Sequence, residues 1–458
     1  MVRSDAPPAP AAPQAGPDVP AATPRPAHVP LLTLLTVTHL LVDAYATMVP
    51  ALLPFWQARF GLTYGLSGLI TGIANITSSV AQPVVGILTE RGRDTRWVAV
   101  ACFTATVGLC ATGIAGSYPL FLLLVVIGGL GVSAFHPQGY KLTGLHGGSR
   151  QAVATSWFLV GGNVGVAVGP LVATAVVVRF GSPGTMFLLV PGLLLAATLY
   201  WLVPRWSGFG SPGLGSRLAR PSSLPGQAQS RPAAPALSDV ARLSLRRRSL
   251  AIGVLVALVA VRSTVSSGLT SFIPLYYVRI AGSGEEAASR VLAGMLLVGA
   301  VATIAGGYLA DRWGRLRLLA VGLAATPPLL LLFLAAPAGS PAAVAALWGA
   351  GATLTSSFPI TVVLAQELWH ERRALASGLI VGFAFGLGGL LVPAVGLVAD
   401  RWGLAPALRL LAGAPLVALI LTAVLAALLL LPEAGNGRGR LGRLGRLSRP
   451  RATARSGR

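Results

Sequence analysis

Charged residues are scarce in this sequence. Only 10% of its 458 residues are charged and 54% are apolar, whereas about 25% of the residues of a soluble globular domain are usually charged. Apolar runs longer than about 18 residues recur along the chain, which is typical of transmembrane helices. The composition therefore excludes a soluble enzyme and indicates a membrane protein that crosses the bilayer many times.

Acidic residues and cysteines are rarer still. The chain has 13 Asp and Glu residues against 35 Lys and Arg, which gives a net charge of +22. This positive charge falls mostly in predicted loops and tails. We therefore explain it by the orientation of the protein in the membrane and expect no nucleic-acid partner. The two cysteines, Cys102 and Cys110, lie in one apolar run, too far apart to pair with each other. We expect two free thiols that pack as small apolar side chains.

Motifs of catalysis are also missing. The sequence has no Ser/His/Asp set and no phosphate-binding loop at usable spacing, and no Cys/His cluster with the spacing of metal ligands. We therefore predict that the chain is not an enzyme and holds no metal and no cofactor. A membrane-embedded enzyme or a lipid-handling protein is the weaker alternative.

The apolar stretches predict an all-α membrane protein with twelve transmembrane helices in two six-helix bundles. The first bundle covers residues 30–203, with helices over 31–56, 66–89, 97–116, 119–142, 152–178 and 185–203. The second covers residues 250–432, with helices over 250–277, 289–310, 317–336, 341–366, 374–399 and 405–431. The other segments are a Pro- and Ala-rich N-terminus (1–29) that we expect to be disordered, an Arg-rich linker (204–249) and an Arg-rich disordered tail (433–458).

The distribution of basic residues predicts the orientation in the membrane. With a cytoplasmic N-terminus, most Lys and Arg residues fall in cytoplasmic segments, as the positive-inside rule expects. We therefore predict a multi-pass protein of the cell (inner) membrane with both termini in the cytoplasm. The linker and tail then fix the topology and contact anionic lipid at the cytoplasmic face. We expect the protein to function as a monomer.

The two halves repeat each other. The stretch 156–181 resembles 377–403, since each runs from a serine through spaced glycines to an aromatic residue followed by glycine. Glycines four residues apart let helices approach closely. The glycines assigned to helix packing on this ground are Gly161, Gly165, Gly169, Gly382 and Gly386. Repeated six-helix halves predict a transporter whose site lies between the halves, near the middle of the membrane.

Ionisable residues inside the predicted spans form the candidate transport site. His39 and Asp43 lie one turn apart on one helix face, and Asp43 and Arg262 lie at similar depths in the first and seventh helices. A charge inside the bilayer is costly and usually faces a partner or a water-filled path. Asp43 is thus either a proton carrier or half of a static pair with Arg262. Arg262 contacts either Asp43 or an anionic substrate.

Other polar residues in the spans have two interpretations each. His39 either shares the proton or only forms a hydrogen bond on the helix face. His136 precedes Pro137 in a helix that we predict to be kinked. It either has a structural role, in which the kink opens the helix to a cavity, or belongs to the proton path, and we favour the structural role. Gln82 and Asn163 either line the path or form hydrogen bonds between helices.

The clearest local motif is the loop GGYLADRWGRLR (306–317). It resembles the loop that joins the second and third helices of each half in the major facilitator superfamily. The matching positions are Gly307, Asp311, Arg312, Gly314 and Arg315. An earlier, less regular copy keeps Gly86 and Arg91 and has Glu90 where aspartate is usual. The resemblance implies a cytoplasmic gate that breaks and re-forms as the halves rock, and the alternative is a topological anchor that does not move.

A wider resemblance covers most of the first half. The segments HLLVDAYATMVPALLP (39–54), SSVAQPVVG (78–86), GLGVSAFHPQG (129–139) and GGNVGVAVGP (161–170) are similar in order to the fosmidomycin resistance protein family. The last segment, which ends at Pro170, also resembles part of an antiporter motif, and close helix packing explains it equally well. This family implies proton-driven efflux of a small polar or phosphonate-type compound. The alternative is an uptake carrier for a small organic anion without obligatory proton exchange.

Overall fold

The described part of the chain is helical throughout. The computed structural model describes residues 27–82, 84, 94–207 and 243–430, and these residues form helices and no strand. Eleven of the helical spans are long and apolar enough to cross a membrane. The predicted span 66–89 includes residues outside the described ranges and begins with α3 (Tyr64–Asn75). The predicted all-α membrane fold is confirmed.

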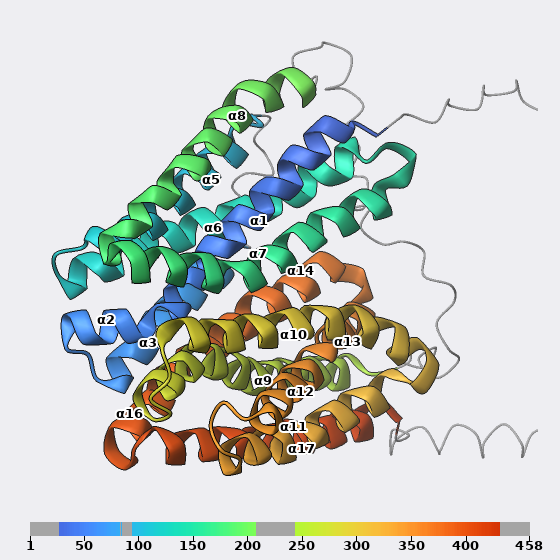
Figure 1. Ribbon diagram of the computed structural model, residues 1–458. Helices are drawn as coiled ribbons and strands as arrows, with labels where there is room; N and C mark the ends of the chain where they lie inside the picture. The colour runs from blue at the N-terminus through green and yellow to red at the C-terminus, as the bar shows by residue number, and fades with distance from the viewer. Residues whose placement is uncertain (1–26, 83, 85–93, 208–242, 431–458) are drawn as a thin grey trace, which may run out of the picture.

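The chain forms two helical halves, which Figure 1 shows one above the other. The first half consists of α1 (Val29–Ala51), α2 (Leu53–Phe60), α3, the π-helix η1 (Ile76–Val80), α5 (Trp97–Cys110), α6 (Tyr118–His146), α7 (Gln151–Phe180) and α8 (Leu189–Ser207). The second half consists of α9 (Leu245–Arg279), α10 (Glu285–Trp313), α11 (Arg315–Ala335), α12 (Pro341–Ser356), α13 (Phe358–Leu368), α14 (Arg373–Gly378), the π-helix η8 (Leu379–Ala384), α15 (Phe385–Leu390), α16 (Val392–Trp402) and α17 (Leu404–Leu430). Cys102 and Cys110 are both buried, free thiols, as predicted.

Prolines divide three of the predicted spans. The helix expected over 31–56 ends at Ala51, and α2 follows with Pro54 in its first turn. The span expected over 341–366 breaks at Ser357, before Pro359, and the span over 374–399 restarts at α16 with Pro393. Proline lacks an amide hydrogen and is tolerated in the first turn of a helix, so each proline begins a new segment.

The helices also extend beyond some predicted boundaries. α8 continues to Ser207 and α9 begins at Leu245, so both reach into the segment 204–249 that was predicted as linker. The Ser244 side chain caps α9 by accepting a hydrogen bond from the Arg247 amide. Most of the linker lies outside the described residues. So do nearly all of the predicted disordered N-terminus (1–29) and the whole predicted tail (433–458).

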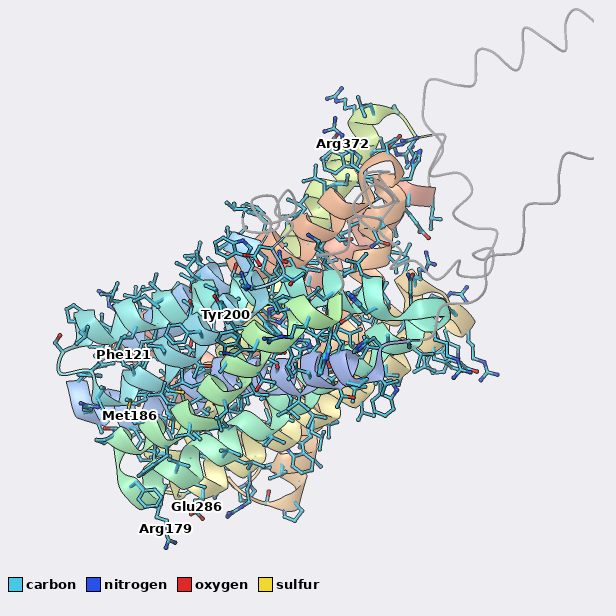
Figure 2. The ribbon with its side chains drawn as sticks, turned by 90° about the horizontal axis from the view of Figure 1, so that it is seen from above. Phe121, Arg179, Met186, Tyr200, Glu286 and Arg372 are labelled. Carbon is cyan, nitrogen blue, oxygen red and sulfur yellow. The ribbon has the colours of Figure 1, made fainter. Side chains whose placement is uncertain are left out.

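The molecule has two ends along the helix axes. We call the end where α1 begins and α17 finishes the terminal end, and the opposite one, where α2 meets α3, the distal end (Figure 1). Figure 2 shows Arg372 at one end of the molecule and Arg179 and Glu286 at the other. Charged side chains at both ends and apolar helices between them are the arrangement that a bilayer requires.

Two helix pairs form most of the contact between the halves. α3 packs against α16, and α7 packs against α10. Within the halves, α1 lies against α7, and α9 lies against α15. The repeated stretches 156–181 and 377–403 therefore take equivalent places beside the first helix of each half, which is what the sequence repeat predicts.

Glycines set the distance between α1 and α7. A Cβ atom on Gly161, Gly165 or Gly169 would lie 2.5, 2.0 or 2.3 Å from a backbone oxygen of α1. The second half differs from the expected match, because a Cβ on Gly386 would meet the Val80 side chain of the other half at 2.4 Å. It is Gly388 that packs against α9, with a Cβ position 2.5 Å from the Ala260 oxygen. Gly382 is buried in η8.

Substitution of Gly165 tests this packing. We expect Gly165→Ala to destabilise the protein by about 1 to 3 kcal/mol, the usual cost of overpacking, because the backbone oxygen of Leu40 cannot move aside. Gly413→Ala is the matched control, since no atom lies within 4 Å of its Cβ position in α17. The measurement is the Tm of each variant in detergent. Equal Tm values for the two variants would contradict the packing argument.

Candidate functional site

Three ionisable side chains meet inside the first half. His39 and Asp43 lie one turn apart on α1, and His136 approaches from α6. The His39 Nε2 atom is 3.2 Å from Asp43 Oδ2, and the His136 Nε2 atom is 3.2 Å from Asp43 Oδ1. We call these three residues the His–Asp–His cluster. The side chain of His39 is 3% exposed and those of Asp43 and His136 are 15% and 18% exposed, so the cluster is mostly buried.

Backbone carbonyls fix the orientation of both histidines. The Nδ1 atom of His39 lies 2.7 Å from the oxygen of Phe158 on α7, and its ring stacks on that of Phe158 at 4.0 Å. The Nδ1 atom of His136 lies 2.8 Å from the Val132 oxygen one turn back in α6. A carbonyl oxygen can only accept, so each Nδ1 carries a hydrogen and each Nε2 is directed at the carboxylate.

The hydrogen-bond geometry has a consequence for protons. With Nδ1–H committed to a carbonyl, a neutral imidazole presents only a lone pair at Nε2. The carboxylate oxygens of Asp43 also present lone pairs, so each 3.2 Å contact needs one shared hydrogen on the nitrogen or on the oxygen. The cluster forms both hydrogen bonds only when it holds two such protons. Loss of either proton leaves two lone pairs facing each other in an apolar surrounding.

A glycine that the sequence analysis did not single out forms one wall of the cluster. A Cβ atom on Gly162 of α7 would lie 2.6 Å from His39 Nε2 and 2.7 Å from Asp43 Oδ2. Any side chain here would push into the contact between the two residues. Its position next to Gly161, in the motif GGNVGVAVGP, is the sequence signal that could have identified it.

Arg262 lies apart from the cluster, and the expected ion pair with Asp43 is not formed. Arg262 lies on α9 and is buried, with 2% of its surface exposed. Its Nη1 donates a hydrogen bond to the Leu354 oxygen at 3.3 Å, and its guanidinium lies 5.3 Å from the ring centre of Phe358. Among the described residues, Nε and Nη2 have no hydrogen-bond partner. Similar depth in the sequence did not bring the two charges together, because the two histidines occupy the carboxylate oxygens.

A cavity of about 140 Å³ lies between the halves. The first half contributes Asn163 and Val166 from α7, and the second contributes residues of α9, α10 and α12. Its polar lining is Asn163, Ser266, Thr303 and Thr355. Asn163 follows Gly162, whose Cβ position faces His39 and Asp43 of the His–Asp–His cluster. Asn163 therefore lines a cavity, and its place on a transport path stays a prediction.

Arg262 stands beside the same cavity. Leu354, whose carbonyl accepts its hydrogen bond, lines the cavity, and so does Ser266, one turn further along α9. A buried guanidinium with two unpartnered nitrogens retains donors for an incoming anion. The first half thus reaches the cavity through Asn163, next to the glycine that faces the cluster, and the second through Leu354, which accepts the hydrogen bond of Arg262.

Gln82 does not join this group. Its side-chain amide donates a hydrogen bond to the Ser78 oxygen at 2.8 Å, within its own helical segment. The hydrogen bonds that cross between the halves include one from Asn75, which donates to Ser267 Oγ at 2.9 Å, and one from Ser271, which donates to Thr71 at 2.7 Å. The Pro170 oxygen accepts from Ser289 of α10 at 3.2 Å, so the end of the GVAVGP motif also lies at this interface.

The gate residues are described in one of the two copies. Gly86, Glu90 and Arg91 lie outside the described residues. In the second copy, Gly314 ends α10 with φ +91°, a conformation that favours glycine. Arg315 pairs with Glu367 of α13, and the Arg312 guanidinium lies 5.9 Å from the ring centre of Tyr308. Asp311 is exposed and Gly307 faces open space.

The cluster also changes the expectation about metals. Local spacing gave no metal-ligand set, yet the ligand atoms of His39, Asp43 and His136 lie within 4.8 Å of one another. His136 comes from a distant helix, so sequence spacing could not show this. Two hydrogens shared with Asp43 would satisfy both contacts without a metal ion.

Comparison with known proteins agrees with the fold. The chain is 29% identical over 391 residues to the Fosmidomycin resistance protein of Escherichia coli (strain K12), covering 85% of this chain and 91% of that protein. It is 30% identical over 395 residues to the Uncharacterized MFS-type transporter YfnC of Bacillus subtilis (strain 168), with the same two coverages.

Solved structures give the same result for the architecture. A bacterial homologue of the human lysosomal transporter Spinster, in an inward-facing and occupied conformation, matches with a TM-score of 0.67 and 17% identity over 88% of this chain and 96% of its own. The nucleoside transporter NupG matches with a TM-score of 0.64 and 13% identity over 86% and 98%. A family model described as the Major Facilitator Superfamily matches residues 35–393. The chain belongs to the Major Facilitator Superfamily.

Proposed function

We propose that this transporter exports a small polar or anionic compound in exchange for protons. The observation that carries the proposal is the His–Asp–His cluster, which needs two shared protons to form its hydrogen bonds. Gly162, which lies against the cluster, precedes Asn163, which lines the cavity between the halves. Intramembrane ionisable groups in carriers usually mark proton or substrate paths. The cluster sits in the first half and Arg262 in the second, so each half contributes one charged element.

Proton binding at the cluster can be linked to movement of helices. Asp43 belongs to α1, His136 belongs to α6, and the carbonyl that orients His39 belongs to α7. Protonation forms the hydrogen bond between His136 of α6 and Asp43 of α1, and deprotonation removes it, while the contact of His39 with α7 remains. A change in the packing of α1 and α7 reaches the cavity through Asn163, and the halves can then rock to open it on the other side.

Arg262 is the proposed contact for an anionic group of the substrate. Its Nε and Nη2 donors are unpartnered among the described residues. A carboxylate, phosphate or phosphonate would accept from two guanidinium donors at once. The resemblance to a protein named Fosmidomycin resistance protein favours export and a phosphonate-type compound. We further propose that the protein is a monomer of the inner membrane with both termini in the cytoplasm, and that the proton gradient drives its transport.

The proton role is tested by Asp43→Asn in proteoliposomes. We expect loss of substrate-driven proton flux with normal insertion and Tm, because an amide cannot take up the shared protons. The matched control is Asp94→Asn, an exposed acid before α5. Unchanged proton-coupled flux in Asp43→Asn would refute the role. Wild-type flux that does not respond to an imposed pH gradient would instead favour an uptake carrier or facilitator without obligatory proton exchange.

The substrate role is tested by Arg262→Gln. We expect the binding free energy of a phosphonate to weaken by about 1.5 to 3 kcal/mol, the value of a hydrogen bond to a charged group. The pH dependence of transport, which we assign to the His–Asp–His cluster, should be retained. Binding is measured by calorimetry with fosmidomycin as the probe. Unaltered affinity would show that the anion binds elsewhere, whatever the outcome for Asp43.

The wall residue is tested by Gly162→Ala. Its methyl group would lie within 2.7 Å of Asp43 Oδ2, so we expect separation of Asp43 from His39 and reduced proton coupling. Gly144→Ala is the control, because its Cβ position in α6 faces open space. Proton flux per substrate molecule is the measurement. Wild-type coupling in Gly162→Ala would show that the contact between His39 and Asp43 is dispensable.

A further inference from the structure

One pentapeptide occurs twice in the second half. Ala-Asp-Arg-Trp-Gly ends α10 at residues 310–314 and ends α16 at residues 399–403. In both copies the glycine has positive φ, +91° and +88°, and its amide donates to the alanine oxygen. The chain runs in opposite directions through the two helices. The first copy therefore lies at the terminal end and the second at the distal end.

The aspartate of the second copy bridges the two halves. Asp400 Oδ1 accepts a hydrogen bond from the Tyr64 amide at 2.6 Å, and Oδ2 accepts one from the Gly65 amide at 2.8 Å. These are first-turn amides of α3, which have no acceptor within their own helix. The positive end of the helix dipole also favours a carboxylate at this position. Asp400 is thus a cap for a helix of the other half.

Glycines bring the two helices close enough for this contact. A Cβ atom on Gly65 would lie 3.0 Å from Asp400 Oδ2, and one on Gly68 would lie 2.9 Å from the Val392 oxygen. On the opposite side, a Cβ on Gly396 would lie 2.3 Å from the Tyr64 oxygen. The backbones of α3 and α16 are therefore in contact along the stretch that ends at the Asp400 carboxylate. This contact closes one side of the distal end.

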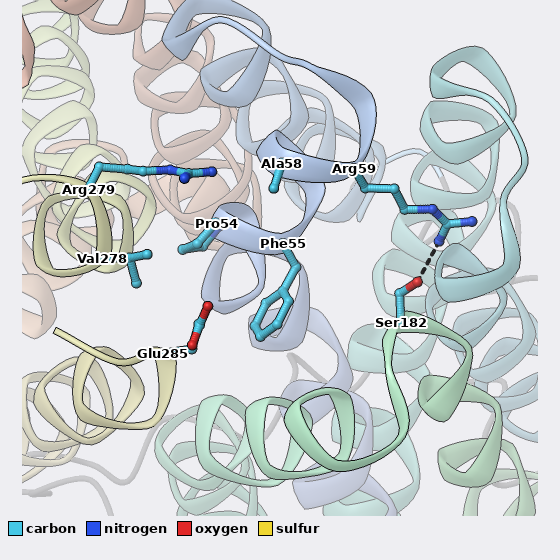
Figure 3. A pocket seen from close by; sticks show the side chains of 8 residues that line it. All are labelled: Pro54, Phe55, Ala58, Arg59, Ser182, Val278, Arg279 and Glu285. Carbon is cyan, nitrogen blue, oxygen red and sulfur yellow. Dashed lines mark hydrogen bonds between the residues drawn. The ribbon is translucent and has the colours of Figure 1, made fainter. Parts of the chain in front are cut away.

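A second polar contact lies nearby. Arg279 of α9 donates from Nε to Gln57 Oε1 of α2 at 3.1 Å, again between the halves. Next to it is a pocket of about 420 Å³, shown in Figure 3, in which Arg279 and Glu285 face α2 while Arg59 is turned away to Ser182. At the terminal end the first copy of the pentapeptide differs: both aspartates are exposed, but among the described residues only Asp400 accepts hydrogen bonds, and Asp311 has no such contact.

We infer that Asp400 is the latch of the distal end: its two hydrogen bonds to α3 hold that end closed and must break each time it opens. The carboxylate is suited to this task because charge-assisted hydrogen bonds to amides are strong when made, whereas water can replace them once the helices separate. Asp400 is a positioning residue that sets the balance between the two facing states. Nothing in the latch depends on the proton or the substrate proposed above.

The latch is tested by cross-linking on a background that lacks the native cysteines. Thr71→Cys with Ser271→Cys places two thiols where Ser271 Oγ now donates to Thr71 Oγ1 across the closed interface at 2.7 Å. We expect Asp400→Ala to raise the ratio of open to closed states about tenfold, which corresponds to about 1.4 kcal/mol, and so to slow disulfide formation. Asp400→Asn, which keeps one acceptor, should give an intermediate rate and serves if the alanine variant does not fold.

Two controls separate a latch from a general structural role. Glu286→Gln removes an exposed acid at the same end that pairs with Arg290 of its own helix, at 3.7 Å, and should leave the rate unchanged. Asp311→Asn alters the same pentapeptide at the other end and should not slow cross-linking. A folded Asp400 variant that lowers Tm but cross-links at the wild-type rate would overturn the latch. An equal slowing in Glu286→Gln would do so as well.

Discussion

A carboxylate inside an apolar helix bundle must find its hydrogen-bond partners within the protein. Asp43 finds them in two imidazoles, one from its own helix and one from α6. Those imidazoles are themselves held by backbone carbonyls of α7 and α6. The requirement therefore extends over three helices, because displacing any of them leaves a buried polar group without a partner. The geometry of the first half depends on this chain of contacts.

Close helix packing is what makes those contacts possible. The glycines of α7 let its backbone approach α1, which brings the Phe158 carbonyl to His39 and leaves room at Gly162 for the carboxylate. The same device recurs where α3 meets α16, and there it brings Asp400 to the first-turn amides of α3. Small residues thus allow polar contacts in both places. In a membrane the hydrophobic effect does not drive helices together, so their association depends on close packing of the backbones.

The separation of Asp43 from Arg262 has its own consequence. A direct ion pair would neutralise both charges and leave the cavity with neither a proton site nor an anion site. Here the carboxylate is paired with two histidines, whereas the guanidinium keeps two donors unpartnered among the described residues. The two halves therefore contribute different chemistry on either side of the cavity at Asn163 and Ser266.

The sequence by itself determined the membrane class, the two helical halves and the presence of ionisable groups on the first and seventh helices. Apolar length and glycine spacing are local properties, so they can be read along the chain. It did not determine which charges meet: it paired Asp43 with Arg262, favoured a structural role for His136, and missed Gly162 and Asp400. Contacts between helices far apart in sequence depend on the rotation and distance of packed helices. Only the tertiary structure fixes these, and it decided that His136 completes the cluster and that Asp400 caps a helix of the opposite half.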